Sequence, residues 1–190
     1  MRTSYFWYTI CWFHYKTYKM KIIIYLAASA NGKISNNRNE PDWLSPEFSQ
    51  GFADISQRTQ AVIMGKTTYN FLSPDYLPLK EGGSLVVLTH DTKATPSQSN
   101  VLFTSDSPEK IIAQLAAKGH TEAVIIGGTQ TVNTFVKAGL VNELILVIEP
   151  VLFGKGLPLI DELDLEYKLL LSDVKKLNNN TVQLHYKIKD

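Results

Sequence analysis

The feature that most constrains the fold is a short apolar run that stops at two glycines, Val124-Ile125-Ile126-Gly127-Gly128-Thr129-Gln130. Together with the polar, helix-competent segment from Thr131 to Ala138, it predicts a strand, a tight turn and a helix. Glycine lets a ligand approach the backbone closely, and the first N–H groups of a helix are unpaired and suit a phosphate. An ordinary turn between a strand and a helix has the same pattern, so the interpretation depends on the rest of the chain.

Two other predicted strands also end at residues that suit a ligand. The apolar run Ala61–Met64 continues into Gly65-Lys66-Thr67-Thr68, and Ser84–Leu88 ends at Thr89-His90. Strands that alternate with helices predict a mostly parallel sheet with helices on both faces, and such sheets bind ligands at the carboxyl ends of their strands. The sequence therefore predicts a cradle for a pyrophosphate and a further phosphate. It contains neither G-x-G-x-x-G nor the P-loop pattern.

The other elements complete an α/β fold: a mixed, mostly parallel sheet flanked by helices, with a C-terminal antiparallel hairpin. Lys21–Ala28 and Glu143–Val151 are apolar enough for buried strands, and the hairpin strands are expected at Tyr167–Lys175 and Thr181–Lys189. Ser45-Pro46-Glu47 and Ser107-Pro108-Glu109 carry the chemistry of helix starts: a capping serine, a first-position proline and a first-turn acid.

Composition limits the domain count and the partners. We expect one domain over residues 20–190, with residues 1–19, rich in aromatic side chains, as an extension outside the fold and Met20 as the natural start. The rival interpretation of residues 1–19 is a signal peptide, but no small-x-small cleavage site follows.

The net charge of +1 argues against a nucleic-acid partner, and no stretch is long enough to cross a membrane. Cys11 is the only cysteine, which excludes an intrachain disulfide, favours a cytoplasmic protein and leaves no predicted metal site.

Several motifs resemble one enzyme superfamily. Val62-Ile63-Met64-Gly65-Lys66-Thr67-Thr68-Tyr69 resembles the I-M-G-[RK]-x-T-[WY] segment of dihydrofolate reductases, and Ile125-Ile126-Gly127-Gly128 resembles their I-G-G turn. The pattern from Pro150 through Gly154 and Gly156 to Pro158-Leu159, and Trp43-Leu44-Ser45-Pro46-Glu47, resemble the related reductase domain of bacterial riboflavin biosynthesis, the RibD C-terminal domain. The resemblance runs from about Met20 to the C-terminus and implies a stand-alone protein of this type.

The resemblance implies hydride transfer from NADPH to a C=N bond of a pterin-like or aminopyrimidine substrate, as in 5-amino-6-(5-phosphoribosylamino)uracil reductase. It also implies a homodimer and a small-molecule substrate. By matched position, the substrate would meet Asn31, Trp43 and Leu44. The cofactor would meet Ala28 and Gly32 near the nicotinamide, Thr89 and His90 near the 2′-phosphate, and Gly65, Lys66, Thr67, Thr68, Gly127, Gly128, Thr129 and Gln130 along the pyrophosphate and nicotinamide side.

The sequence departs from both families on the substrate side. Dihydrofolate reductases carry an acid five residues after the loop tryptophan, where this chain has Phe48, and Glu47 comes one position early. Glu47 is the candidate catalytic acid, or a first-turn acid that favours the helix dipole. Riboflavin reductases carry basic residues in the following helix, where Arg58 is the only base here. A dihydrofolate reductase proper and a non-catalytic nucleotide-binding module therefore remain as alternatives.

Overall fold

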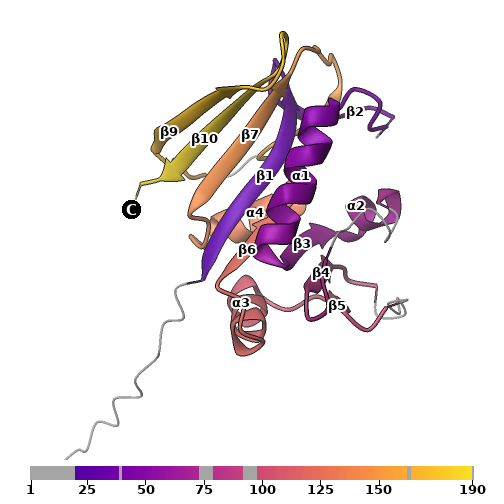
Figure 1. Ribbon diagram of the computed structural model, residues 1–190, viewed down its shortest axis with the longest axis vertical. Helices are drawn as coiled ribbons and strands as arrows, with labels where there is room; N and C mark the ends of the chain where they lie inside the picture. The colour runs from indigo at the N-terminus through magenta and orange to yellow at the C-terminus, as the bar shows by residue number, and fades with distance from the viewer. Residues whose placement is uncertain (1–19, 39, 73–78, 92–97, 162–163, 190) are drawn as a thin grey trace, which may run out of the picture.

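One twisted eight-stranded sheet organises the molecule (Figure 1). The computed structural model describes residues 20–38, 40–72, 79–91, 98–161 and 164–189. The strands are β1 (Lys21–Ser29), β2 (Lys33–Asn36), β3 (Ala61–Gly65), β4 (Ser84–Leu88), β5 (Val101–Thr104), β6 (Glu122–Ile125), β7 (Glu143–Glu149), β8 (Gly156–Pro158), β9 (Leu169–Lys176) and β10 (Val182–Ile188). The helices are α1 (Pro46–Thr59), α2 (Lys66–Phe71), α3 (Pro108–Ala117) and α4 (Thr129–Lys137).

The strand order confirms the predicted fold class. The large sheet runs β5-β4-β3-β6-β1-β7-β10-β9. The first six strands in this spatial order, from β5 to β7, pair in parallel with their neighbours, whereas β10 is antiparallel to both β7 and β9. The parallel strands thus end at one edge, and the C-terminal hairpin extends the sheet on one side. A second, two-stranded sheet of β2 and β8 was not predicted, because three residues in β8 are too few to show an alternating pattern.

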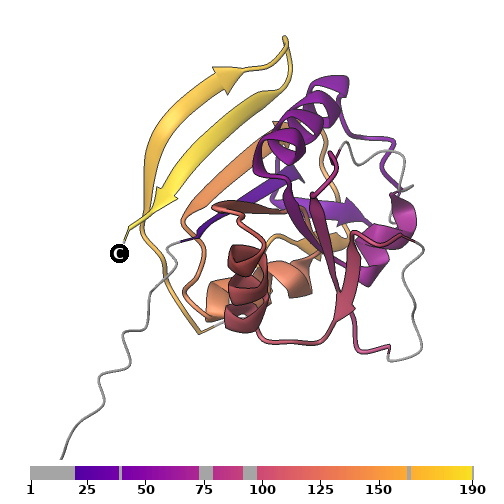
Figure 2. The same ribbon diagram turned by 60° about the horizontal axis from the view of Figure 1, so that its bottom comes forward.

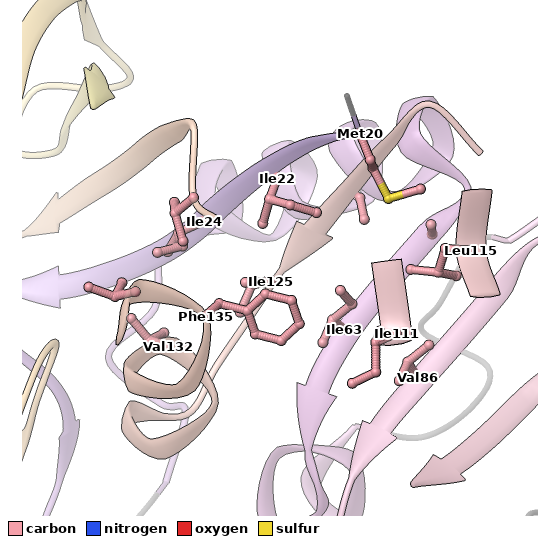
Figure 3. Close-up of a cluster of buried hydrophobic side chains, with 14 of the residues drawn as sticks. Met20, Ile22, Ile24, Ile63, Val86, Ile111, Leu115, Ile125, Val132 and Phe135 are labelled. Carbon is pink, nitrogen blue, oxygen red and sulfur yellow. The ribbon is translucent and has the colours of Figure 1, made fainter. Parts of the chain in front are cut away.

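Two apolar layers cover the two faces of the sheet. Alternate residues of β1 point to opposite faces: Ile22 and Ile24 belong to one buried cluster, and Ile23 and Tyr25 to the other. Figure 3 shows the first cluster, in which Phe135 of α4 lies against isoleucines of the central strands and α3 packs beside it. The second cluster lies beneath α1 and α2. Coverage on both faces is why the central strands are continuous apolar runs.

Helix starts were predicted more accurately than element ends. Ser45 caps α1 by accepting a hydrogen bond from the Phe48 N–H, and Ser107 caps α3 in the same way, as expected. Helix α4 begins at Thr129, two residues before the prediction, because Gly128 already serves as its N-cap. Strand β7 ends at Glu149, and the hairpin strands differ from prediction by one or two residues.

The prediction for residues 1–19 lies outside the described residues. In the part of the chain that the structure describes, no helix has the length and apolar character needed to cross a membrane.

Every residue of β9 is exposed, and Figures 1 and 2 show that the β9–β10 hairpin extends beyond the helices.

Candidate functional site

The predicted strand ends meet at one cavity. Strands β3 and β6 are neighbours, and the Gly65 N–H donates a hydrogen bond to the Gly127 carbonyl at 2.9 Å. A cavity of about 810 Å³ opens at this edge of the sheet. Its lining includes most of the residues that the resemblance placed around the cofactor: Gly65, Lys66, Thr67, Thr68, Thr89, His90, Gly127, Gly128, Thr129 and Gln130. The structure therefore brings together three segments that are far apart in the sequence.

Glycine is required at the floor of this cavity. Gly127 has a φ of +123°, a region that L side chains rarely adopt, and the Gly127–Gly128 peptide bond is cis. A Cβ on Gly65 would lie only 3.0 Å from Thr131 Oγ1. These glycines let β3 and β6 lie against the start of α4 and leave bare backbone on the cavity wall.

The start of α4 is open toward this cavity. Helices α1 and α3 have serine caps, whereas Gly128 supplies no side-chain cap to α4. The first turn of α4 therefore keeps N–H groups for a ligand. The buried Thr129 hydroxyl donates to the Pro158 carbonyl of β8 and fixes this turn against the small sheet. An anion placed here would meet both the unpaired N–H groups and the positive end of the helix dipole.

A basic and polar region of the cavity lining lies beside the ends of β4 and β5. The Lys66 ammonium lies 4.0 Å from the centroid of the Phe103 ring and 4.9 Å from that of Tyr69, a cation–π arrangement. Thr104, Ser105 and Asp106 at the end of β5 also line the cavity. The sequence analysis missed them, although the rule that ligands bind at strand ends applies to β5 as well. A hydrogen bond from the Lys110 ammonium, 2.7 Å away, holds the pKa of Asp106 below its ordinary value.

Aromatic and aliphatic side chains form another part of the cavity lining. Trp43 and Leu44, both predicted substrate residues, line the cavity here together with Phe48, Phe52, Phe71 and Leu72. Trp43 meets Phe153 edge to face, and Phe48 stacks on Tyr25, each with ring centroids 5.2 Å apart. Burial raises the pKa of Tyr25, so its hydroxyl stays neutral and donates to the Phe48 carbonyl. In the sequence, Phe48 and Phe52 show only the helical spacing typical of a packed face, so no motif marks them as lining residues.

Four predicted site residues are not among those that line the cavity. The Asn31 side chain accepts a hydrogen bond from the Phe153 N–H and donates one to the Phe153 carbonyl. Gly32 occupies the adjoining turn with a φ of +80°. Ala28 is buried, whereas its neighbour Ala27 lines the cavity. The carboxylate of Glu47, the candidate catalytic acid, accepts a 2.9 Å hydrogen bond from the Asn178 side chain in the β9–β10 turn. The structure thus places Glu47 against the C-terminal hairpin.

A different buried acid, Glu149, holds the start of α1. Its side chain, 1% exposed, accepts hydrogen bonds from the Ser45 N–H at 3.0 Å, from the Ser45 hydroxyl at 2.7 Å and from the Thr181 hydroxyl at 3.1 Å. Glu149 therefore joins β7 to the residue before β10 and to the segment that leads from Trp43 into α1. Sequence reasoning missed this residue, because nothing local distinguishes it from a strand-end acid.

Comparisons with known proteins agree with this architecture. YwjB of Bacillus subtilis, an uncharacterized protein, is 31% identical over 172 residues, which cover 87% of this chain and 97% of YwjB. A protein of Shewanella sp. PV-4, provisionally assigned to riboflavin biosynthesis, has a crystal structure that matches this one with a TM-score of 0.77 and 26% sequence identity. The match covers 90% of this chain and 100% of the Shewanella chain. The deaminase/5-amino-6-(5-phosphoribosylamino)uracil reductase of Thermotoga maritima shares the fold at 16% identity and a TM-score of 0.72, over 90% of this chain and 57% of its own.

The sheet order, the C-terminal hairpin and the glycine-lined cavity define an α/β domain with the fold of dihydrofolate reductase-like reductases. The model of the RibD C-terminal domain matches residues 20–183, and the chain belongs to that family.

Proposed function

We propose that this protein is an NADPH-dependent reductase that transfers hydride to an unsaturated heterocycle of the pterin or aminopyrimidine type. One observation carries the proposal: the Gly65 and Gly127–Gly128 junctions and an aromatic wall belong to the same cavity. Its bare backbone suits a dinucleotide, and its aromatic wall suits a planar ring. The reductase activity named for the Thermotoga maritima protein, which has the same fold, supports this reaction class.

The residues divide into a cofactor region and a substrate region. The first turn of α4, Gly127 and Gly128 would hold the pyrophosphate, and Lys66 would add a cation beside it. Thr89 and His90 would meet the 2′-phosphate. NADPH supplies the hydride when bound. The chain's contribution is to place the acceptor carbon within reach of that hydride and to exclude water with its apolar wall.

Water is the proposed source of the proton. Glu47, the candidate catalytic acid, could deliver the proton only from the cavity, and its carboxylate accepts a hydrogen bond from Asn178 instead. Glu47→Gln tests the assignment, because the amide keeps the size of the side chain and cannot supply a proton. Unchanged turnover with unchanged NADPH binding supports water. A loss of kcat without a loss of NADPH binding returns the role to Glu47.

The central experiment is a titration of the purified full-length protein with NADPH and NADH, followed by fluorescence and thermal shift. We expect tight NADPH binding and weaker NADH binding. Gly65→Val should abolish both, since a side chain there meets Thr131. Gly154→Val is the matched control, because that glycine is exposed and a Cβ on it meets no atom within 4 Å. Failure of both dinucleotides to bind the wild type would refute the proposal.

A non-catalytic nucleotide-binding module is the second candidate, favoured by the position of Glu47 away from the cavity. Dinucleotide binding without NADPH oxidation by any pterin or aminopyrimidine would support it. Tight methotrexate binding would instead identify a dihydrofolate reductase proper. We further propose a cytoplasmic location, in line with a sequence whose only cysteine is Cys11.

A further inference from the structure

The charges around the cavity narrow the substrate class. We infer that the acceptor is an uncharged planar heterocycle without a phosphate group, bound against the aromatic wall of the cavity. This inference rests on the proposed function and deepens it. The wall formed by Trp43, Phe48, Phe52 and Phe71 supplies ring faces and edges for stacking, and Leu44 and Leu72 add aliphatic surface.

The basic side chains that line the cavity follow strands whose ends would hold the dinucleotide. Among the described lining residues, the basic side chains are Lys66 and His90, both beside the ends of β3 and β4. The Lys66 ammonium already lies over the Phe103 ring. A bound dinucleotide would engage these two groups, which leaves neither for a phosphate on the substrate.

Among the lining residues that the structure describes, three are acids, against these two bases. Glu40 lines it near Trp43, Asp161 lines it beside α4, and Asp106 lies at the β5 end, where Lys110 neutralises it. A dianionic phosphate requires charge-assisted donors, and burial without them is costly. Near Trp43 it would meet the Glu40 carboxylate instead.

The two arginines among the described residues are both held in ion pairs. Arg38, which does not line the cavity, contacts Glu40 at 2.6 Å and Asp42 at 3.4 Å, so its single charge faces two carboxylates. Arg58, the only base of α1, lies in the last turn of that helix and pairs with Glu122 at 3.2 Å, at the start of β6. It is therefore at the opposite edge of the sheet from the cavity. The α1 surface beside the substrate region carries Phe48 and Phe52.

The test compares two ligands that differ only in a phosphate. Full-length protein saturated with NADPH is titrated with 5-amino-6-(5-phosphoribosylamino)uracil and with its phosphate-free riboside, and then with an uncharged pterin. Binding is measured by calorimetry and turnover by NADPH oxidation. We expect the riboside or the pterin to bind at least tenfold more tightly than the phosphorylated compound. Equal or tighter binding of the phosphorylated compound overturns the inference, and so does binding of the cofactor with no binding of any of the three.

A pair of charge-reversal variants tests the physical cause. Glu40→Lys places a cation on the cavity wall and should raise affinity for the phosphorylated compound at least fivefold, with little change for the riboside. Asp42→Lys makes the same change in net charge beside the same arginine but outside the cavity lining, and should leave both affinities unchanged. Equal effects of the two variants would contradict a local role of charge. Failure of NADPH itself to bind would refute the proposed function separately, before any substrate is added.

Discussion

Replacement of Glu149 should weaken the fold and the substrate region together. The buried carboxylate accepts three hydrogen bonds, two from Ser45 and one from the Thr181 hydroxyl. Glu149→Ala removes all three and leaves donors in a region with little access to water. Each hydrogen bond to a charged group is worth about 1.5–3 kcal/mol, and an unsatisfied buried donor costs about 1–3 kcal/mol. Because these terms overlap, we expect a loss of about 3–5 kcal/mol in the free energy of unfolding, a large part of the roughly 5–15 kcal/mol typical of a domain.

Glu149→Gln separates charge from shape. The amide oxygen can still accept from Ser45, and the Thr181 hydroxyl can turn to accept from the amide N–H, so the expected loss is about 1–2 kcal/mol. Urea unfolding of the full-length protein at neutral pH measures both variants. A double-mutant cycle with Ser45→Ala should give a coupling energy of about 0.5–3 kcal/mol.

The same change should alter function in a selective way. Ser45 lies between Trp43–Leu44 and the first turn of α1, which carries Phe48, so a looser anchor should raise KM for the substrate and leave NADPH affinity unchanged. The reasoning is refuted if Glu149→Ala costs less than about 1 kcal/mol, since three lost hydrogen bonds to a charged group cannot be that cheap. Additive effects of Glu149→Gln and Ser45→Ala would also contradict it.

Three further predictions concern other regions. His90→Ala should raise the Kd of NADPH by about threefold to tenfold, as expected for an exposed charge-assisted contact, and leave that of NADH unchanged; equal effects on both would exclude a role at the 2′-phosphate. Burial opposes ionisation of Glu143, but hydrogen bonds from Lys21 and His185 outweigh it and lower the pKa of Glu143 below its ordinary value of 4.5. Ionised Glu143 therefore stabilises the folded state. This stabilisation is complete above about pH 4.5 and is lost as the pH falls through the folded-state pKa. Glu143→Gln should remove that part of the pH dependence in urea unfolding, and an unchanged profile would argue against it. The homodimer remains a prediction, and β9 is an edge strand with an exposed apolar row in which Leu171 is 55% exposed. Leu171→Lys should give a monomer by light scattering, whereas Leu102→Lys, at an exposed leucine of β5, should not; a monomeric wild type would contradict the prediction.

Local signals in the sequence were enough for most of the fold. Ser45-Pro46 and Ser107-Pro108 predicted two helix starts, because capping depends on residues within one turn. Continuous apolar runs predicted the parallel strands, because burial on both faces leaves no polar position. The glycines at 65, 127 and 128 predicted the cavity floor, because bare backbone at the end of a strand is a local property.

Contacts between distant residues decided the rest. The direction of a helical side chain changes by about 100° with each position, so the sequence could not show that Phe48 would line the cavity while Glu47 turned to Asn178, 131 residues away. The β2–β8 sheet and the anchor from Glu149 to Ser45 join segments whose local patterns do not indicate a partner. The sequence by itself determined which elements form and which backbone is left bare. Only the tertiary structure decided which side chains share the cavity, because the packing of helices on the sheet sets their orientation.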